Sequence, residues 1–236
     1  MRPMLYGISA MSLVVPFTAT AQASSLRLSP TNLEIVAPAS AGMLTLTNDG
    51  TRPIQMQVRI YRWTQSGGED HLEPADDVVA SPPLTTLPAN KPYQVRIIRI
   101  AHRPVTSEES YRVVVDELPD PNRKRAGAVA LVVRYSLPVF FKSEDATPAE
   151  VKWGLVQSKG NLLLTAHNAG NARLRLSDVQ LVQGGRLIGG RKGLVGYVLG
   201  GASMQWPILA DKKVLPGNLT FKGQSESGPF NTDLTK

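Results

Sequence analysis

Hydrophobic and polar residues alternate with a period of two along most of this chain. Runs of Val, Ile, Leu and Thr are separated by Pro, Gly, Asn and Asp, which is the pattern of β-strands joined by tight turns. The pattern predicts strands at residues 26–28, 32–36, 41–48, 54–64, 78–81, 84–87, 93–101, 111–118, 128–141, 151–159, 161–168, 174–182, 187–199, 202–207 and 218–223. No segment has the 3.6-residue period of an amphipathic helix. Short strands at this spacing predict an all-β protein made of β-sandwiches.

A polar segment at residues 142–149 separates the predicted strands into two sets. It reads Lys-Ser-Glu-Asp-Ala-Thr-Pro-Ala, a composition typical of a linker between domains. We therefore expect an N-terminal domain at residues 24–145 and a C-terminal β-sandwich domain at residues 146–236, with about 120 and 90 residues respectively.

The first 23 residues have the features of a secretory signal peptide. Arg2 precedes an apolar core at residues 4–17, and the small-residue site Ala-Gln-Ala ends at Ala23. We expect cleavage before Ser24 and a mature protein on the far side of a membrane. An uncleaved anchor is the alternative, but the apolar run is short for a bilayer span, which needs about 20 residues.

Composition excludes several classes of site. The chain has no cysteine, so it has no thiol nucleophile, thiolate metal site or disulfide. Lys and Arg number 26 against 19 Asp and Glu, a formal charge of +7, which favours solubility or affinity for an anion, a membrane surface or a partner with carboxylates. Nucleic acid is not expected as a partner, because the charges are dispersed and the aromatic residues are too few for a stacking surface.

Nothing in the sequence indicates catalysis. The histidines do not have the spacing of metal ligands, and no nucleophile-elbow pattern occurs. These histidines are His71, His102 and His167. We expect no enzymatic activity, no metal, no cofactor and no small-molecule substrate. The tryptophans Trp63, Trp153 and Trp206 are interpreted as core aromatic residues.

The most informative stretch is the apolar run at residues 128–141. Its alternation places Val129, Leu131 and Val133 on one face of an extended strand. A strand this apolar must be covered. These three residues could pack in their own sandwich core, or an exposed edge could pair with another chain.

Several separated motifs occur in the order found in one family. They are Ile-Tyr-Arg-Trp-Thr-Gln at 60–65, Val-Val-Ala-Ser-Pro-Pro at 78–83, Gln-Val-Arg-Ile-Ile-Arg at 94–99, Tyr-Arg at 111–112, Asp-Glu-Leu-Pro at 116–119 and Arg-Tyr-Ser-Leu-Pro-Val-Phe at 134–140. With them the chain resembles the periplasmic pilus-assembly chaperones of the chaperone–usher pathway, the PapD-like superfamily. It is most similar to the archaic Csu-type or sigma-fimbrial branch.

The resemblance implies two immunoglobulin-like β-sandwich domains arranged as a boomerang. Such a chaperone lends a strand to a pilus subunit that lacks one, and delivers the subunit to an outer-membrane usher. The implied location is the periplasm, and the implied clients are spore-coat-U-like pilins. Val129, Leu131 and Val133 match the donor positions of the family.

The resemblance also implies a cationic anchor for the C-terminal carboxylate of the subunit. At the two usual basic positions this chain has Asn32 and Pro138. Arg112 and Arg134, which are cations within apolar strands, are therefore our candidates for the anchor. For each arginine the alternative is an internal ion pair, for example with Asp116 or Glu117.

The family further implies an interdomain ion network, and we assign it to Glu117, Lys142 and Asp211. Lys142 stands where Arg is usual, so the planar fork of a guanidinium would be lost. The rival function is a secreted two-domain structural protein, either a pilin or an adhesin. Such a protein would need a self-incomplete fold or an N-terminal donor extension, whereas here the mature N-terminus leads almost directly into a predicted strand.

Overall fold

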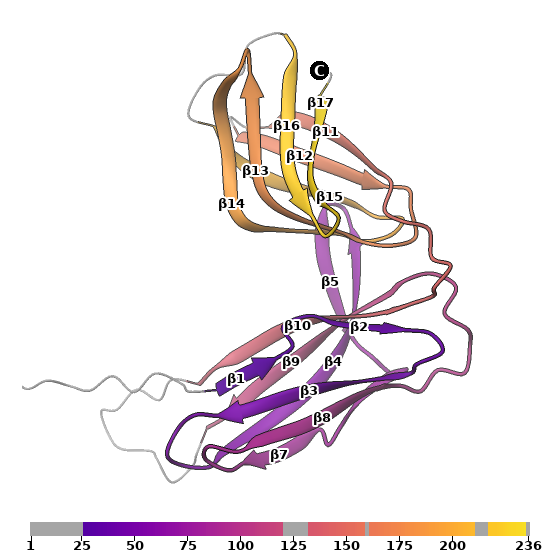
Figure 1. Cartoon of the computed structure of the whole chain (residues 1–236), viewed down its shortest axis with the longest axis vertical. Helices are drawn as coiled ribbons and strands as arrows, with labels where there is room; N and C mark the ends of the chain where they lie inside the picture. Colours follow the sequence, from indigo (N-terminus) through magenta and orange to yellow (C-terminus); the bar gives the residue numbers. More distant parts are fainter. Residues whose placement is uncertain (1–25, 120–131, 159–160, 211–216, 235–236) are drawn as a thin grey trace, which may run out of the picture.

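The computed structural model describes residues 26–119, 132–158, 161–210 and 217–234, which form two lobes of β-strands (Figure 1). The expectation of an all-β chain is confirmed, since the described residues form strands and no helix. In these ranges there is accordingly no helix that is long and apolar enough to span a membrane. The predicted signal peptide at residues 1–23 lies outside the described residues.

The N-terminal lobe contains two sheets that face each other. One sheet has the order β1-β3-β8-β6, and the other has the order β2-β10-β9-β4-β5 with β7 also paired to β4. The strands are β1 Leu26–Ser29, β2 Leu33–Val36, β3 Ala41–Asn48, β4 Ile54–Ser66, β5 Glu69–Pro74, β6 Val78–Ser81, β7 Leu84–Leu87, β8 Pro92–Arg99, β9 Glu109–Leu118 and β10 Arg134–Lys142. The chain leaves the first sheet after β1 and enters the second at β2, where it runs parallel to β10.

The core of the N-terminal lobe lies between these sheets and follows from the alternation of each strand. On β9, Tyr111, Val113 and Val115 point inward and are at most 1% exposed. Arg112 and its neighbours two residues away therefore belong to the other face of the sheet. This outer face is turned toward the second lobe, because Trp63 and Phe140 on it pack against Tyr197 of that lobe.

The C-terminal lobe is one curved sheet with the order β11-β12-β15-β14-β13-β16-β17. The strands are β11 Val151–Ser158, β12 Asn161–Asn168, β13 Leu174–Gln183, β14 Arg186–Val198, β15 Ser203–Ala210, β16 Leu219–Ser225 and β17 Gly228–Leu234. Its core contains Trp206 and Phe221, and Trp153 packs against Phe221 with ring centroids 4.7 Å apart. Both tryptophans of this lobe thus pack as core aromatic residues, as expected.

Most predicted strands are found within a few residues of their expected bounds, and two observed strands were missed. β5 was missed because its sequence, Glu-Asp-His-Leu-Glu-Pro, is polar and fully exposed. β17 was missed because its burial is partial. The strand expected at 128–141 is assigned from Arg134 onward, and residues 128–131 lie outside the described part of the chain.

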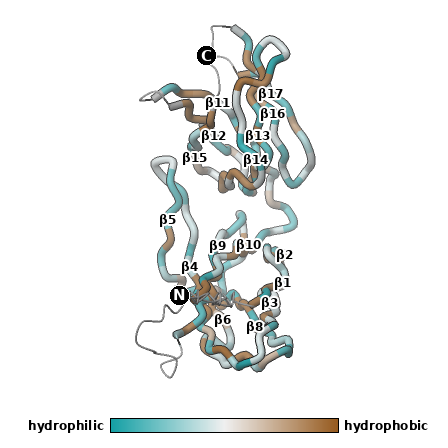
Figure 2. The backbone as a smooth tube through the Cα atoms, turned by 90° about the vertical axis from the view of Figure 1, so that its left-hand side faces the viewer, coloured by the Kyte–Doolittle hydropathy of each residue, from teal (hydrophilic) through white to brown (hydrophobic). Residues whose placement is uncertain are grey.

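A long hairpin made by β4 and β5 rises from the N-terminal lobe toward the other lobe (Figure 2). Its turn contains Gly67 and Gly68, both with positive φ, and Gly68 forms a bridge with Met204 of β15. Gln65 donates to the carbonyl of Tyr197 at 2.9 Å and accepts from the amide of Leu199 at 2.8 Å. The hairpin therefore fastens the two lobes together on one side.

Candidate functional site

One edge of β10 is open over the first half of the strand. β9 covers one side from Arg134 to Phe141, whereas on the other side β2 begins only opposite Val139. In the described residues no strand lies on this second side between Arg134 and Pro138. The open stretch is the kind of edge to which another strand can add.

The backbone groups that this edge presents can be assigned from the ladder. The amide of Glu117 donates to the carbonyl of Val133 at 2.9 Å, so alternate residues from Val133 onward bond to β9. The residues between them, Arg134 and Ser136, therefore turn their N–H and C=O groups to the open edge. The bond from Ala37 to the carbonyl of Lys142 on the β2 side agrees with this assignment.

Of the three predicted donor residues, only Val133 lies in the described part of the chain. It is partly exposed and directly precedes β10, and the preceding Val132 is 49% exposed. Val129 and Leu131 lie outside the described residues, so their role stays a prediction.

The outer face of the six-stranded sheet carries both anchor candidates, but their surroundings differ. Arg112 is partly buried, with its guanidinium carbon 3.8 Å from the ring centroid of Trp63 and 5.7 Å from that of Tyr197. Burial lowers the pKa of Arg112, while the charge of Asp70 opposes this. No described carboxylate lies within ion-pair distance of Arg112, so its charge is available to a partner.

Arg134 is instead engaged in an internal ion pair. Its Nε donates to Asp116, which also accepts from Arg59 at 2.6 Å. Burial raises the pKa of Asp116, but its bonds with Arg134 and Arg59 outweigh that effect and the pKa is held below its usual range. The Arg134 side chain is 67% exposed, so it could exchange this partner, but it starts from a satisfied state.

Asn32, Pro138 and Arg112 lie in one row across the sheet. Pro138 is paired with Arg112 across β10 and β9, and Leu33 with Val139 places Asn32 beside Pro138. Of the two positions where the resemblance expects basic residues, Pro138 is therefore the direct neighbour of Arg112, and Asn32 lies one strand further away. The side chain of Asn32 itself donates to Glu34 at 3.3 Å.

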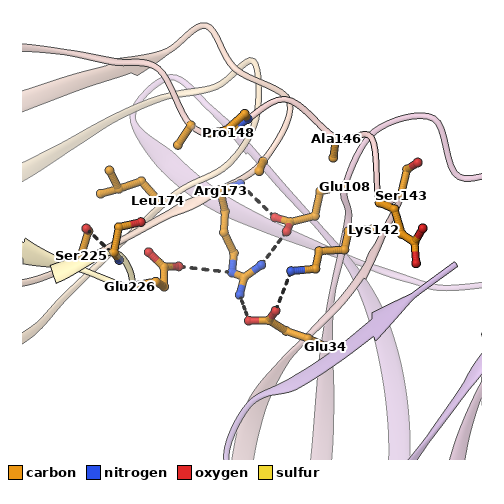
Figure 3. A pocket seen from close by; sticks show the side chains of 14 residues that line it. Glu34, Glu108, Lys142, Ser143, Ala146, Pro148, Arg173, Leu174, Ser225 and Glu226 are labelled. Atoms are coloured by element: carbon orange, nitrogen blue, oxygen red, sulfur yellow. Dashed lines mark hydrogen bonds and ion pairs between the residues drawn. The ribbon is translucent and has the colours of Figure 1, made fainter.

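A charged cluster joins the lobes beside the segment that links them, near Ser143, Ala146 and Pro148 (Figure 3). Arg173, whose side chain is 5% exposed, lies among the carboxylates of Glu34, Glu108 and Glu226, and Lys142 bonds to Glu34 at 3.0 Å. Burial raises the pKa of Glu108, against the opposing charge of Arg173. A pocket of about 370 Å³ lies beside this cluster.

The sequence also matches a known family. Residues 25–146 match the model described as "Pili and flagellar-assembly chaperone, PapD N-terminal domain". This chain belongs to that chaperone family. No curated protein sequence matches it. The match favours the chaperone interpretation over a secreted structural protein.

Solved structures of similar fold are also pilus chaperones. The chain is 24% identical to a chain in the structure of the CsuC–CsuE chaperone–tip adhesion subunit pre-assembly complex from archaic chaperone–usher Csu pili of Acinetobacter baumannii, covering 90% of this chain and 99% of that one with a TM-score of 0.70. It is 21% identical to a chain in the structure of the Salmonella enterica SafA pilin in complex with the SafB chaperone. That match covers 91% of this chain and 98% of the other, with a TM-score of 0.65. These likenesses establish the fold, which is that of two immunoglobulin-like β-sandwich domains.

The predicted interdomain network of the chaperone is only partly brought together. Lys142 lies in the charged cluster, whereas Glu117 lies near the far end of β9, about 30 Å from Glu108 at the strand's start given a rise of about 3.3 Å per residue. Placing Glu117 in the cluster was therefore wrong, because an extended strand separates it from the interface. Asp211 lies outside the described residues.

Sequence reasoning missed the residues that occupy the center of this cluster. The sequence pattern selects none of Arg173, Glu34 and Glu108 as site residues. Arg173 also lies over the ring of Phe140, with its guanidinium carbon 3.6 Å from the centroid. A signal was present, since Glu108 directly precedes the apolar strand β9, but its partner Arg173 lies in the other lobe and could not be read from spacing.

Proposed function

We propose that this protein is a periplasmic chaperone that binds pilus subunits by lending them the open edge of β10, and then delivers them to an outer-membrane usher. The predicted signal peptide supports the location. The similarity to a CsuC–CsuE complex and to a SafA–SafB complex supports subunits of this kind as clients. The clients we expect are spore-coat-U-like pilins.

The observation that carries the proposal is the open edge between Arg134 and Pro138. Backbone hydrogen bonds along such an edge supply affinity without regard to sequence, while alternate side chains enter pockets of the partner. Val129, Leu131 and Val133 would be these side chains. Binding of this kind is stoichiometric and involves no nucleotide, no cofactor and no catalysis.

Pro138 sets the end of the edge that a client strand can use. Its position in the ladder would turn an N–H toward the open side, and proline has none. Beyond it, β2 already occupies the edge from Val139 onward. A client strand that pairs with β10 would therefore end beside Pro138, and only β10 would then separate its last residue from Arg112 on β9.

We propose Arg112 as the principal anchor for the terminal carboxylate of the client, with Arg134 as a secondary cation. Arg112 has no ionic partner among the described residues, and it lies directly across the ladder from Pro138, the last residue of the open edge. A guanidinium can hold a carboxylate through two parallel hydrogen bonds, which fixes position as well as charge. Arg134 would first have to leave Asp116.

The decisive experiment removes one outward N–H of β10 and leaves the bonds to β9 in place. Ser136→Pro does this, because proline is tolerated on an edge whose N–H faces away from the sheet. Ser136→Ala is the matched control. Each variant is co-expressed in a bacterial periplasm with the pilin encoded beside its gene, and the soluble complex is measured.

We expect wild type and Ser136→Ala to protect the pilin, while Ser136→Pro folds normally but protects it at least tenfold less. Leu131→Asp should fail in the same way, because a charge would enter an apolar pocket of the client. Equal protection by all four proteins, or a pilin that is soluble alone, would contradict strand donation.

A further inference from the structure

The strongest feature that the proposed function leaves unexplained is an aromatic cluster at the junction of the lobes. It contains Trp63, Phe140, Tyr197, Leu199 and Ala202, of which the first two belong to the N-terminal lobe and the last three to the C-terminal lobe. All are at most 9% exposed. An apolar cluster of this kind stabilises the contact between the lobes, but it does not by itself explain why the Arg112 guanidinium lies against it.

Arg112 lies on the edge of this cluster, between rings from both lobes. Trp63 and Tyr197 meet edge to face, with centroids 5.4 Å apart and planes at 83°, and both rings are near the Arg112 guanidinium. Guanidinium groups bind the faces of aromatic rings through charge and quadrupole, and leave the N–H groups at their rim free. The rings can therefore hold Arg112 in place without using its hydrogen-bond donors.

The position of Trp63 is itself fixed by polar contacts in the hairpin. Its indole N–H donates to Asp70 at 2.8 Å, and Gln65 donates to the same oxygen at the same distance. Gln65 in turn bonds to the backbone on both sides of Val198 in the other lobe. The position of the ring beside Arg112 thus depends on the docking of the hairpin against the C-terminal lobe.

We propose that Trp63 and Tyr197 are positioning residues, which hold the Arg112 guanidinium across the two lobes so that it can receive the terminal carboxylate of a client. This inference rests on the proposed function. It adds that carboxylate recognition is coupled to the contact between the lobes, since the two rings come from different domains. The lowered pKa of Arg112 agrees with a cation whose water has been largely replaced by rings.

The test compares two forms of one client. The pilin encoded beside the chaperone gene is used as it is, and with two glycines appended, which move the carboxylate by up to about 7 Å. Both forms compete for limiting full-length chaperone, and the ratio of the two complexes is measured. We expect wild type to prefer the native terminus about tenfold, and Arg112→Ala to lose this preference.

Trp63→Leu and Tyr197→Leu should lower the ratio to below threefold although complexes still form, whereas Trp63→Phe and Tyr197→Phe should keep most of it. Phe140→Leu is the control for stability, because Phe140 packs against both rings, with centroids 6.0 Å from each, but lies under Arg173 and does not contact Arg112. A ratio that Phe140→Leu lowers as much as Tyr197→Leu would overturn the positioning role, and so would a ratio that neither ring variant changes.

A second readout needs no client. The Arg112 Hε resonance should be shifted upfield by the Trp63 ring in the free protein, and the shift should shrink in Tyr197→Leu but not in Phe140→Leu. If wild type forms no complex with either pilin, the proposed function fails, and positioning for a client carboxylate fails with it. A normal ratio with an unshifted Hε would overturn the positioning role alone.

Discussion

Pro138 lies directly opposite Arg112 in the antiparallel ladder between β10 and β9. Side chains of such a pair have Cβ atoms about 5 Å apart on the same face of a sheet. The proline thus removes both a charge and an N–H from the position where the resemblance expects a basic residue. Arg112 supplies the charge from the neighboring strand, at the point where the open edge of β10 ends.

The two anchor candidates should differ in their effect on client binding. We expect Arg112→Ala to reduce the affinity for a native pilin by about tenfold or more, because Arg112 lies opposite the end of the edge and has no ion pair within the described part of the chain. Arg134→Ala should reduce it by less than about threefold, because Arg134 already pairs with Asp116. Affinity is measured in an exchange assay, in which each chaperone variant is titrated against a purified complex of the pilin with the wild-type chaperone. A larger loss of affinity in Arg134→Ala than in Arg112→Ala would assign the anchor to Arg134.

Removing Arg173 should weaken the whole interface between the lobes. Arg173→Ala leaves the Glu108 carboxylate, whose side chain is 2% exposed, buried without its cation. We expect the free energy of unfolding in urea at pH 7 to fall by about 4 kcal/mol. Adding Glu108→Gln to the variant should recover part of this loss, because the unpaired charge is then gone.

Arg173→Ala should lower the free energy of unfolding less in mild acid than at pH 7. Burial raises the pKa of Glu108, so in the folded state this group takes up a proton at a higher pH than in the unfolded chain. Without Arg173 the penalty for its charge is present at pH 7 and declines as the pH falls toward the unfolded value near about 4.3. A defect at pH 5 as large as at pH 7 would show that Glu108 is not its source.

Asp77 should make the N-terminal lobe sensitive to acid. Its carboxylate accepts from Arg103 at 2.8 Å, from Tyr111 at 3.0 Å and from Arg62. Burial raises its pKa, but the bond from Arg103 and the charge of Arg62 outweigh this and hold the pKa below its usual range. Its contribution is therefore present above about pH 4 and is lost as the pH falls toward the folded pKa.

We expect Asp77→Asn to lower the free energy of unfolding at pH 7 by about 2 kcal/mol. The free energy of unfolding of this variant should then fall less steeply than that of the wild type between about pH 5 and 3. Urea unfolding at several pH values measures both effects. Asp76→Asn is the matched control, because Asp76 is exposed and takes part in none of the described ion pairs. An unchanged slope in Asp77→Asn would assign the acid sensitivity to another carboxylate.

The turn of the hairpin offers a pair of glycines that separate backbone strain from close packing. Both have positive φ, but a Cβ on Gly68 would lie 2.7 Å from Cγ of Gln205, whereas none of the described atoms lies within 4 Å of a Cβ on Gly67. Gly67→Ala should cost about 1 kcal/mol, and Gly68→Ala clearly more. Faster hydrogen exchange at the Leu199 amide only in Gly68→Ala would show that the hairpin has left β15.

Much of the architecture was predictable because it depends on local pattern. The alternation that buries Tyr111, Val113 and Val115 is visible in the sequence, and β3, β6, β7 and β12 have the expected bounds. β5 escaped prediction because it buries no side chain, so that only its pairing with β4 defines it as a strand. Patterns of hydrophobicity report burial, and a strand without burial leaves no such trace.

The sequence by itself determined the all-β class and the motifs that match the chaperone family, because strand alternation, turn residues and the order of motifs are properties of neighboring residues. Only the tertiary structure decided that Arg134 pairs with Asp116, that Arg112 lies on Trp63 and Tyr197, and that Arg173 occupies the center of the charged cluster. Tyr197 and Arg173 meet their partners across a domain interface, more than 60 residues away along the chain. Such contacts depend on how two folded lobes dock, and no local pattern encodes that geometry.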